Sequence, residues 1–121
     1  WSWAGDGGLF AFRGDTRESA AVSCCLEILY SLPVFNLQPD KPIRDDICLR
    51  IGIDAGPVKF SEDTGRIVSD VINYAAHLEK KGTSPGALSV SGEVFDRLPE
   101  PLQSVFTQKR EFEGRTAHST A

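Results

Sequence analysis

One helical segment of this chain carries two polar side chains whose types and spacing could do chemistry. Asn73 and His77 stand four residues apart between residues 69 and 82, so in a helix they share one face. An asparagine in mid-helix is not favoured by propensity, which indicates a positional role. His77 is neutral in most molecules at pH 7 and cannot make the planar two-pronged contact that arginine makes with phosphate. The segment predicts a polar helix face, with a solvated surface histidine as the alternative for His77.

Two carboxylates outside this segment are further candidates. Asp6 lies in a glycine-rich run between apolar residues, and an Asp-Gly pair so placed predicts a β-hairpin with its tip near Asp6. Asp54 ends a predicted strand. There it is either a carboxylate of a cleft or a hydrated strand end.

The apolar pattern around these residues predicts alternating strands and helices. Period-two alternation over residues 47–54 indicates a strand with one apolar side, and helical spacing over 15–33 should end at the proline. A second helix begins at Ser69 or Asp70 and ends at Gly82. The other expected elements are a hairpin at 1–12, strands at 58–60, 66–68, 87–91 and 105–112, a short helix at 92–98 and a loose polar end at 115–121. This order implies an α/β sandwich with helices over one sheet face.

Composition and charge narrow the class of protein. The 121 residues are 40% hydrophobic and 25% charged, with a formal net charge of −4, which fits one globular domain. We expect no membrane contact, because no apolar run approaches the ~18 residues of a membrane span. We also expect no nucleic-acid binding, because the acidic chain has no basic stripe. Three cysteines cannot pair completely, so we expect a reducing, cytoplasmic location. The missing methionine and the start at Trp1 indicate a piece of a longer chain.

Five segments, in the right order, resemble one family. Leu49–Val58 is similar to the strand of class III nucleotide cyclases that runs arginine, apolar, glycine, apolar, any, any, glycine, proline, valine. Residues 69–79 are similar to the helix G-x-x-V-N-x-A-x-R-L-E of that family. The Gly5-Asp6-Gly7 turn, residues 85–91 and residues 111–114 resemble its metal-binding hairpin, its P-G-x-I-x-x-S strand and a late strand. The resemblance covers nearly the whole chain.

The resemblance implies a fold and a reaction. The fold is ferredoxin-like, with a central, mostly antiparallel sheet, helices on one face, and the first strand missing from this chain. The reaction converts a nucleoside triphosphate to a 3′,5′-cyclic nucleotide and pyrophosphate for signal transduction, in a homodimer. The family uses two Mg²⁺ or Mn²⁺ ions held by two aspartates. An asparagine orients the ribose, an arginine offsets phosphate charge, and a lysine and an aspartate read the purine.

Position by position, the chain matches this functional set in part. The hairpin aspartate that binds metal maps to Asp6, and the ribose asparagine maps to Asn73. The base-reading lysine maps to Ser2, the base-reading aspartate to Arg66, and the transition-state arginine to His77. The other metal aspartate belongs to a strand upstream of these residues. The implied sites are therefore Asp6 for metal, Ser2, Arg66 and Asn73 for nucleotide, and Asn73 and His77 for catalysis.

Two functions follow from this partial match. In the first, residues 1–114 form an atypical or weak cyclase in which His77 or Arg66 offsets phosphate charge, and residues 115–121 are a polar tail. In the second, the fold is kept as a dimerisation or nucleotide-binding regulatory module without turnover. Asp6 is then a plain turn residue, and Arg66 pairs with a nearby surface carboxylate.

Overall fold

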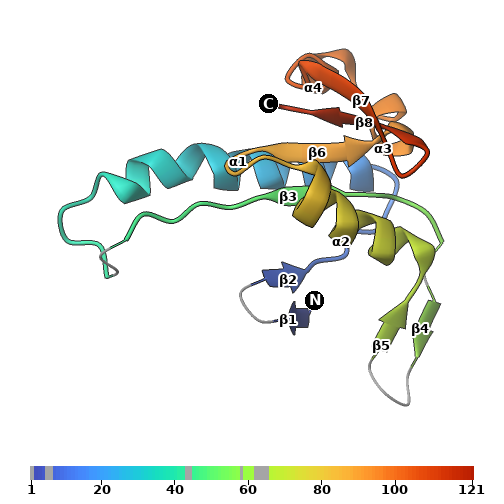
Figure 1. The fold of residues 1–121 in the computed structure, drawn as a ribbon, viewed down its shortest axis with the longest axis horizontal. Helices are drawn as coiled ribbons and strands as arrows, with labels where there is room; N and C mark the ends of the chain where they lie inside the picture. Colours follow the sequence, from blue (N-terminus) through green and yellow to red (C-terminus); the bar gives the residue numbers. More distant parts are fainter. Residues whose placement is uncertain (1, 5–6, 43–44, 58, 62–65) are drawn as a thin grey trace.

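A computed structural model describes residues 1–121 apart from 1, 5–6, 43–44, 58 and 62–65 (Figure 1). Its centre is a mixed four-stranded sheet in the order β3-β6-β8-β7. Strands β3 and β6 are parallel, and the β6–β8 and β8–β7 pairs are antiparallel. In chain order the elements are β1 (Ser2–Ala4), β2 (Gly7–Leu9), α1 (Arg17–Asn36), β3 (Ile51–Ile53), β4 (Lys59–Ser61), β5 (Arg66–Val68), α2 (Asp70–Gly82), β6 (Leu88–Ser91), α3 (Gly92–Asp96), α4 (Glu100–Gln103), β7 (Gln108–Phe112) and β8 (Arg115–Ser119).

Helix α1 covers one face of this sheet, which we call the α1 face. Ile51 and Ile53 of β3 pack against the apolar cluster on this side. Because alternate residues of a strand point to opposite faces, both isoleucines lie on the same side. The buried members of the cluster are Val22, Leu26 and Leu29 from α1, Leu88 and Val90 from β6, and Val94, Leu98 and Phe106 from the segment that follows β6. This cluster is the main core of the domain.

Helix α2 begins and ends where the sequence predicts. Ser69 has an extended backbone, and its hydroxyl accepts a hydrogen bond from the backbone N–H of Ile72 at 3.2 Å. This contact satisfies one of the unpaired donors of the first helical turn. The helix ends at Gly82, and Thr83 returns to extended backbone. The capping signals thus confirm the predicted range.

A glycine on β3 lets α2 approach the other face of the sheet, which we call the α2 face. A Cβ added at Gly52 would lie 2.7 Å from the carbonyl oxygen of Ala75 and 2.7 Å from the amide nitrogen of Glu79. Those distances are shorter than van der Waals contact, so only glycine allows the helix backbone to lie on the strand. The buried apolar residues here are fewer, namely Tyr74, Leu78 and Ala117.

The two long helices lie on opposite faces of the sheet, so the prediction of helices on one face is wrong (Figure 1). The reason lies in the small residues that alternate with the large ones. On β6, Ser89 and Ser91 alternate with Leu88 and Val90, and all four are buried. A strand buried on both sides needs cover on both sides, and the period-two pattern of residues 47–54 showed only the apolar one.

The C-terminal residues form a strand, and the prediction of a loose polar tail at 115–121 is wrong. Strand β8 pairs with β6 on one side and β7 on the other. Ala117, His118 and Ser119 are buried. Small and polar side chains suit this position because the strand lies between two neighbours, and backbone hydrogen bonds hold it rather than large apolar groups.

Several predicted element ends also differ. The strand expected over 105–112 begins at Gln108, and the helix expected over 92–98 ends at Asp96. Helix α1 continues past Pro33 to Asn36; the side-chain amide of Asn36 holds this end by exchanging two hydrogen bonds with the backbone of Ile47, at 2.8 and 3.0 Å. The strand expected over 47–54 is short, because its partner β6 pairs only with Ile51–Ile53. Pairing, rather than alternation, sets its length.

Two antiparallel hairpins stand apart from the main sheet. Strand β1 pairs with β2, which confirms the hairpin predicted at 1–12. Strand β4 pairs with β5, where the sequence predicted strands at 58–60 and 66–68. The β4–β5 hairpin projects beyond the sheet below α2 in Figure 1. The tip of the first hairpin, with Asp6, lies outside the described residues.

Helix α1 is long and apolar. By length and composition alone it could cross a membrane, with a mean hydropathy of 1.3. Its buried residues contact the sheet, and core helices pass the same test. The expectation of no membrane contact stays a prediction.

Candidate functional site

The polar face of α2 forms as the sequence predicts. Asn73 and His77 are both exposed, whereas Tyr74 and Leu78, between and beyond them, are buried against the sheet. Side chains four residues apart on a helix lie about 6 Å from each other. The helix therefore brings an amide and an imidazole together at the surface.

A carboxylate from the other end of the chain contacts this face. The Nδ1 atom of His77 lies 3.0 Å from Oε1 and 3.4 Å from Oε2 of Glu113. Both side chains are about half exposed, at 49% and 43%. A surface pair of this kind contributes little to stability, but it fixes the direction of the imidazole ring.

Glu113 occupies a strained position. Phe112 pairs with Arg115 across a two-residue turn, and the turn residues Glu113 and Gly114 have φ values of 50° and 77°. Positive φ at both positions is the type I′ turn, which favours Asn-Gly or Asp-Gly. A glutamate there costs on the order of 1 kcal/mol. The turn thus holds an unfavourable residue whose carboxylate meets His77.

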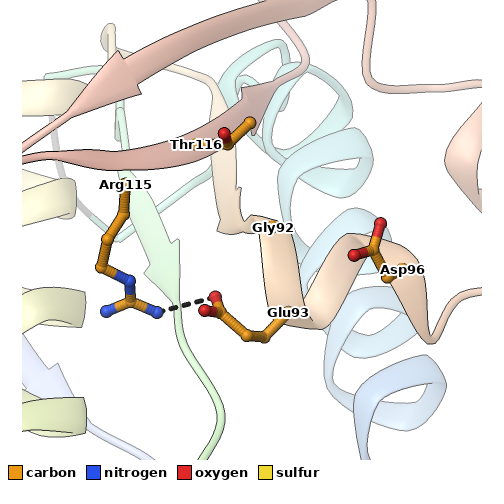
Figure 2. Close-up of a pocket in the computed structure, with 5 residues that line it drawn as sticks. All are labelled: Gly92, Glu93, Asp96, Arg115 and Thr116. Carbon is orange, nitrogen blue, oxygen red and sulfur yellow. Dashed lines mark hydrogen bonds and ion pairs between the residues drawn. The ribbon is translucent and has the colours of Figure 1, made fainter.

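A second, larger network of charged side chains lies on the α2 face. It is centred on Arg115, the residue that follows Gly114 of this turn. Asp54, with a side chain 1% exposed, accepts hydrogen bonds from both terminal nitrogens of Arg115, at 2.9 and 3.1 Å. Arg115 also contacts Glu93 at 2.7 Å (Figure 2). The guanidinium carbon of Arg115 lies 3.8 Å from the ring centroid of Tyr74. The strand-end Asp54 is therefore a buried ion-pair partner, and the interpretation as a hydrated end is wrong.

These contacts set the protonation of the network. The hydrogen bonds that Arg115 donates to Asp54 raise the pKa of Arg115 further, and the hydrogen bond that it donates to Glu93 lowers the pKa of Glu93. Burial raises the pKa of Tyr74, although Arg115 opposes this. Arg115 and Glu93 are therefore both charged near neutral pH, and Arg115 is committed to protein carboxylates rather than to a ligand.

A surface hollow of about 270 Å³ lies beside this network. Its lining residues are Gly92, Glu93, Asp96, Arg115 and Thr116, drawn in Figure 2. No residue predicted as a site residue lines it. The hollow and the Asn73–His77 face are therefore separate features.

The other predicted site residues are placed only in part. Ser2 lies in β1 opposite Leu9, and Arg66 in β5 opposite Ser61, as backbone positions. The roles of these two side chains stay predictions. Asp6 lies outside the described residues, so its role as a metal ligand stays a prediction too.

The described residues do not provide a fitting site for Mg²⁺ or Mn²⁺. Among them, no three His, Cys, Asp or Glu side chains lie close enough together to hold an ion. Asp54, a carboxylate near α2, is already paired with Arg115. We therefore assign no chemical step to a metal.

The sequence analysis missed Glu113 and Arg115 as interacting residues. Both lie beside Gly114, and a glycine after a polar residue between two strands indicates a tight hairpin turn. That signal predicts the β7–β8 turn, but it does not predict that the turn meets α2.

Two solved structures resemble this chain. The first is the catalytic core of a rhodopsin-guanylyl cyclase with converted specificity in complex with ATPalphaS: its TM-score is 0.67, and the match covers 88% of this chain and 59% of that chain at 19% identity. The second, an adenylate/guanylate cyclase/hydrolase from Silicibacter pomeroyi, has a TM-score of 0.60 and 35% identity over 88% of this chain and 62% of that chain. Neither a protein-family model nor a curated protein matches the sequence.

The chain thus spans about three fifths of the length of each solved chain. It has the α+β fold of adenylate/guanylate cyclase catalytic domains, which confirms the fold class expected from the resemblance, although the two long helices lie on opposite faces of the sheet.

Proposed function

We propose that this chain is a class III nucleotide cyclase-like domain that converts a nucleoside triphosphate to a 3′,5′-cyclic nucleotide and pyrophosphate. It acts in the cytoplasm as one half of a homodimer, with weak turnover or altered base choice. The observation that carries the proposal is the exposed Asn73 on α2, within a fold shared with cyclase catalytic domains. The bound ATPalphaS in one of those structures supports a triphosphate as the ligand.

Asn73 is suited to orient a ribose. Its side-chain amide offers both donors and an acceptor, and its exposed position on a capped helix leaves it accessible to a sugar hydroxyl. Holding a hydroxyl at its target phosphorus lowers the barrier by proximity. The need for Mg²⁺ or Mn²⁺ rests on Asp6 and on the resemblance.

A second function is favoured by one contact. The carboxylate of Glu113 lies 3.0 Å from His77, at the position where the resemblance expects a cation for phosphate charge. This negative charge opposes the phosphate charge that builds up in the transition state, so it disfavours turnover rather than the binding of a nucleotide held by other groups. The contact supports a dimerisation or nucleotide-binding regulatory module without turnover.

The two functions differ in the formation of product. We expect cyclic nucleotide by mass detection when the protein, at concentrations that support dimers, is incubated with Mn²⁺ and each of four nucleoside triphosphates. Asn73→Ala should lower turnover at least tenfold. Gln108→Ala removes an exposed amide at the far end of β7 and should not change it.

Absence of product from all four nucleotides would overturn the cyclase proposal. Retained nucleotide binding, measured by titration calorimetry, would then favour the regulatory module.

A further inference from the structure

We propose that His77 and Glu113 form a proton-accepting pair for the attacking hydroxyl, with His77 as the base and Glu113 as its positioning residue. The inference rests on the proposed cyclase function and assigns His77 a role other than that of a cation for phosphate. It is drawn from the contact between α2 and the β7–β8 turn.

The contact selects one tautomer of the imidazole. An ionised carboxylate accepts hydrogen bonds and cannot donate them, so Nδ1 of His77 must carry the hydrogen that points at Glu113. A neutral imidazole has one N–H, and Nε2 is then a lone-pair acceptor. No hydrogen bond from the described part of the chain reaches Nε2. The ring is thus oriented by a carboxylate and has a basic nitrogen available.

The surroundings favour a hydroxyl over a phosphate as the group that meets His77. The charged side chain at hydrogen-bond distance from the ring is Glu113, while Lys80 and Lys81 follow on α2 and the carboxylate of Glu79 pairs with Arg50. The negative Glu113 repels an anion that approaches the ring. A neutral hydroxyl is not repelled in this way.

Asn73 places that hydroxyl within reach. It lies one helical turn before His77 on the same exposed face, where the Cβ atoms of residues four apart lie about 6 Å from each other. A ribose held by the amide is therefore next to the ring. The half-exposed ring leaves room for a substrate to approach Nε2.

The proposed step couples a proton transfer to a displacement at phosphorus. The 3′-hydroxyl gives its proton to Nε2 while its oxygen forms a bond to the α-phosphorus. The bond from that phosphorus to the bridging oxygen breaks, and pyrophosphate leaves with the electron pair. Glu113 stabilises the imidazolium, which releases its proton to solvent after the product departs.

The test is the direction in which Glu113→Gln changes turnover. Loss of the carboxylate removes the orientation of the base, so we expect kcat to fall by 10- to 100-fold with little change in KM. Glu113→Asp should recover part of this loss. Glu111→Gln makes the same charge change on exposed β7 and should leave kcat unchanged. If His77 is instead a cation for phosphate, Glu113→Gln should raise kcat/KM, and that result would overturn the pair.

One further measurement does not depend on turnover. Nitrogen NMR of the full chain should show the Nδ1–H tautomer of His77 in wild type, and a dominant Nε2–H tautomer overturns the pair without any turnover. Absence of product from wild type overturns the cyclase function itself, whereas product with an unaffected Glu113→Gln rate overturns only the pair.

Discussion

The two faces of the central sheet bury different kinds of side chain. On the α1 face, aliphatic residues from α1 and β6 meet in one large apolar cluster. On the α2 face, the buried apolar group is small, and charged residues such as Asp54 and Arg115 fill the space around Tyr74. Both faces are covered by a helix, and the candidate site residues Asn73 and His77 are exposed on the helix of the second.

The α1 face therefore contributes mainly to stability, and the α2 face lies beside the candidate site. An apolar cluster is held by the area it removes from water, and it tolerates changes that conserve volume. A buried ionic network is stable when every charged group in it has a partner. The free energy of unfolding falls most when one partner is removed, because the other charge is then buried without compensation. The candidate site lies beside the network that fixes the β7–β8 turn, and the following changes test the comparison.

Arg115→Met should have the largest effect. It removes both hydrogen bonds to Asp54, whose side chain is 1% exposed, and leaves that carboxylate buried without its cation. We expect the free energy of unfolding to fall by about 3–5 kcal/mol, measured by urea denaturation. Adding Asp54→Asn should recover part of the loss, and a loss below about 1 kcal/mol for the single variant would show that the network is not what holds this face.

Leu88→Ala should have the next largest effect, on the α1 face. The residue is 0% exposed, and the truncation leaves a cavity beneath α1. Unfolding free energy should fall by about 2–5 kcal/mol, again by denaturation. Leu37→Ala is the matched control because Leu37 is 82% exposed; equal losses from the two would contradict the placement of the core.

Gly52→Ala should separate α2 from the sheet. The new methyl would lie 2.7 Å from backbone atoms of α2, so the helix must shift, at a cost of about 1–3 kcal/mol. Gly92→Ala meets its nearest atom at 3.4 Å and should change stability by less than about 0.5 kcal/mol. Thermal unfolding measures both, and a Gly52→Ala protein with wild-type stability would disprove the close approach.

Mild acid should have the smallest effect, through His118 on the α1 face. His118 stacks on Phe95 at 3.7 Å, and burial, aided by Lys109 and opposed by Asp96, holds its pKa below the ordinary 6.5. The unfolded chain therefore binds the proton first, so stability falls as pH drops below about 6.5, until the folded form is protonated too. We expect a loss of about 1 kcal/mol or less between pH 7 and 5.5. His118→Phe should remove this part of the slope, whereas His77→Gln should not.

Local signals predicted much of the fold. The Ser69 cap and Gly82 gave the ends of α2, and turn residues between apolar segments gave the separate strands of the two hairpins. Strand β8 was missed because its pattern of small and polar residues resembles a surface tail until two neighbouring strands are present. The second face of β3 was missed because a glycine carries no apolar signal, although its lack of a side chain is what admits α2.

The sequence predicted the part of the candidate site that lies on α2, and Glu113 of the β7–β8 turn completes it. The spacing of Asn73 and His77 places both on one helix face, and that prediction is confirmed. The partner Glu113 lies far along the chain, in a turn whose contact with α2 depends on the docking of the whole sheet. No spacing rule within one element can reveal such a contact.

The parallel pairing of β3 with β6 has a consequence for the order of folding. Ile51 meets Leu88 only after the chain has passed through β4, β5 and α2, whereas Phe112 meets Arg115 across two residues. Closing a short loop loses less chain entropy, so the β7–β8 hairpin should form early and the β3–β6 ladder late. The turn then presents Glu113 before α2 arrives, and the contact with His77 becomes one of the last steps of folding.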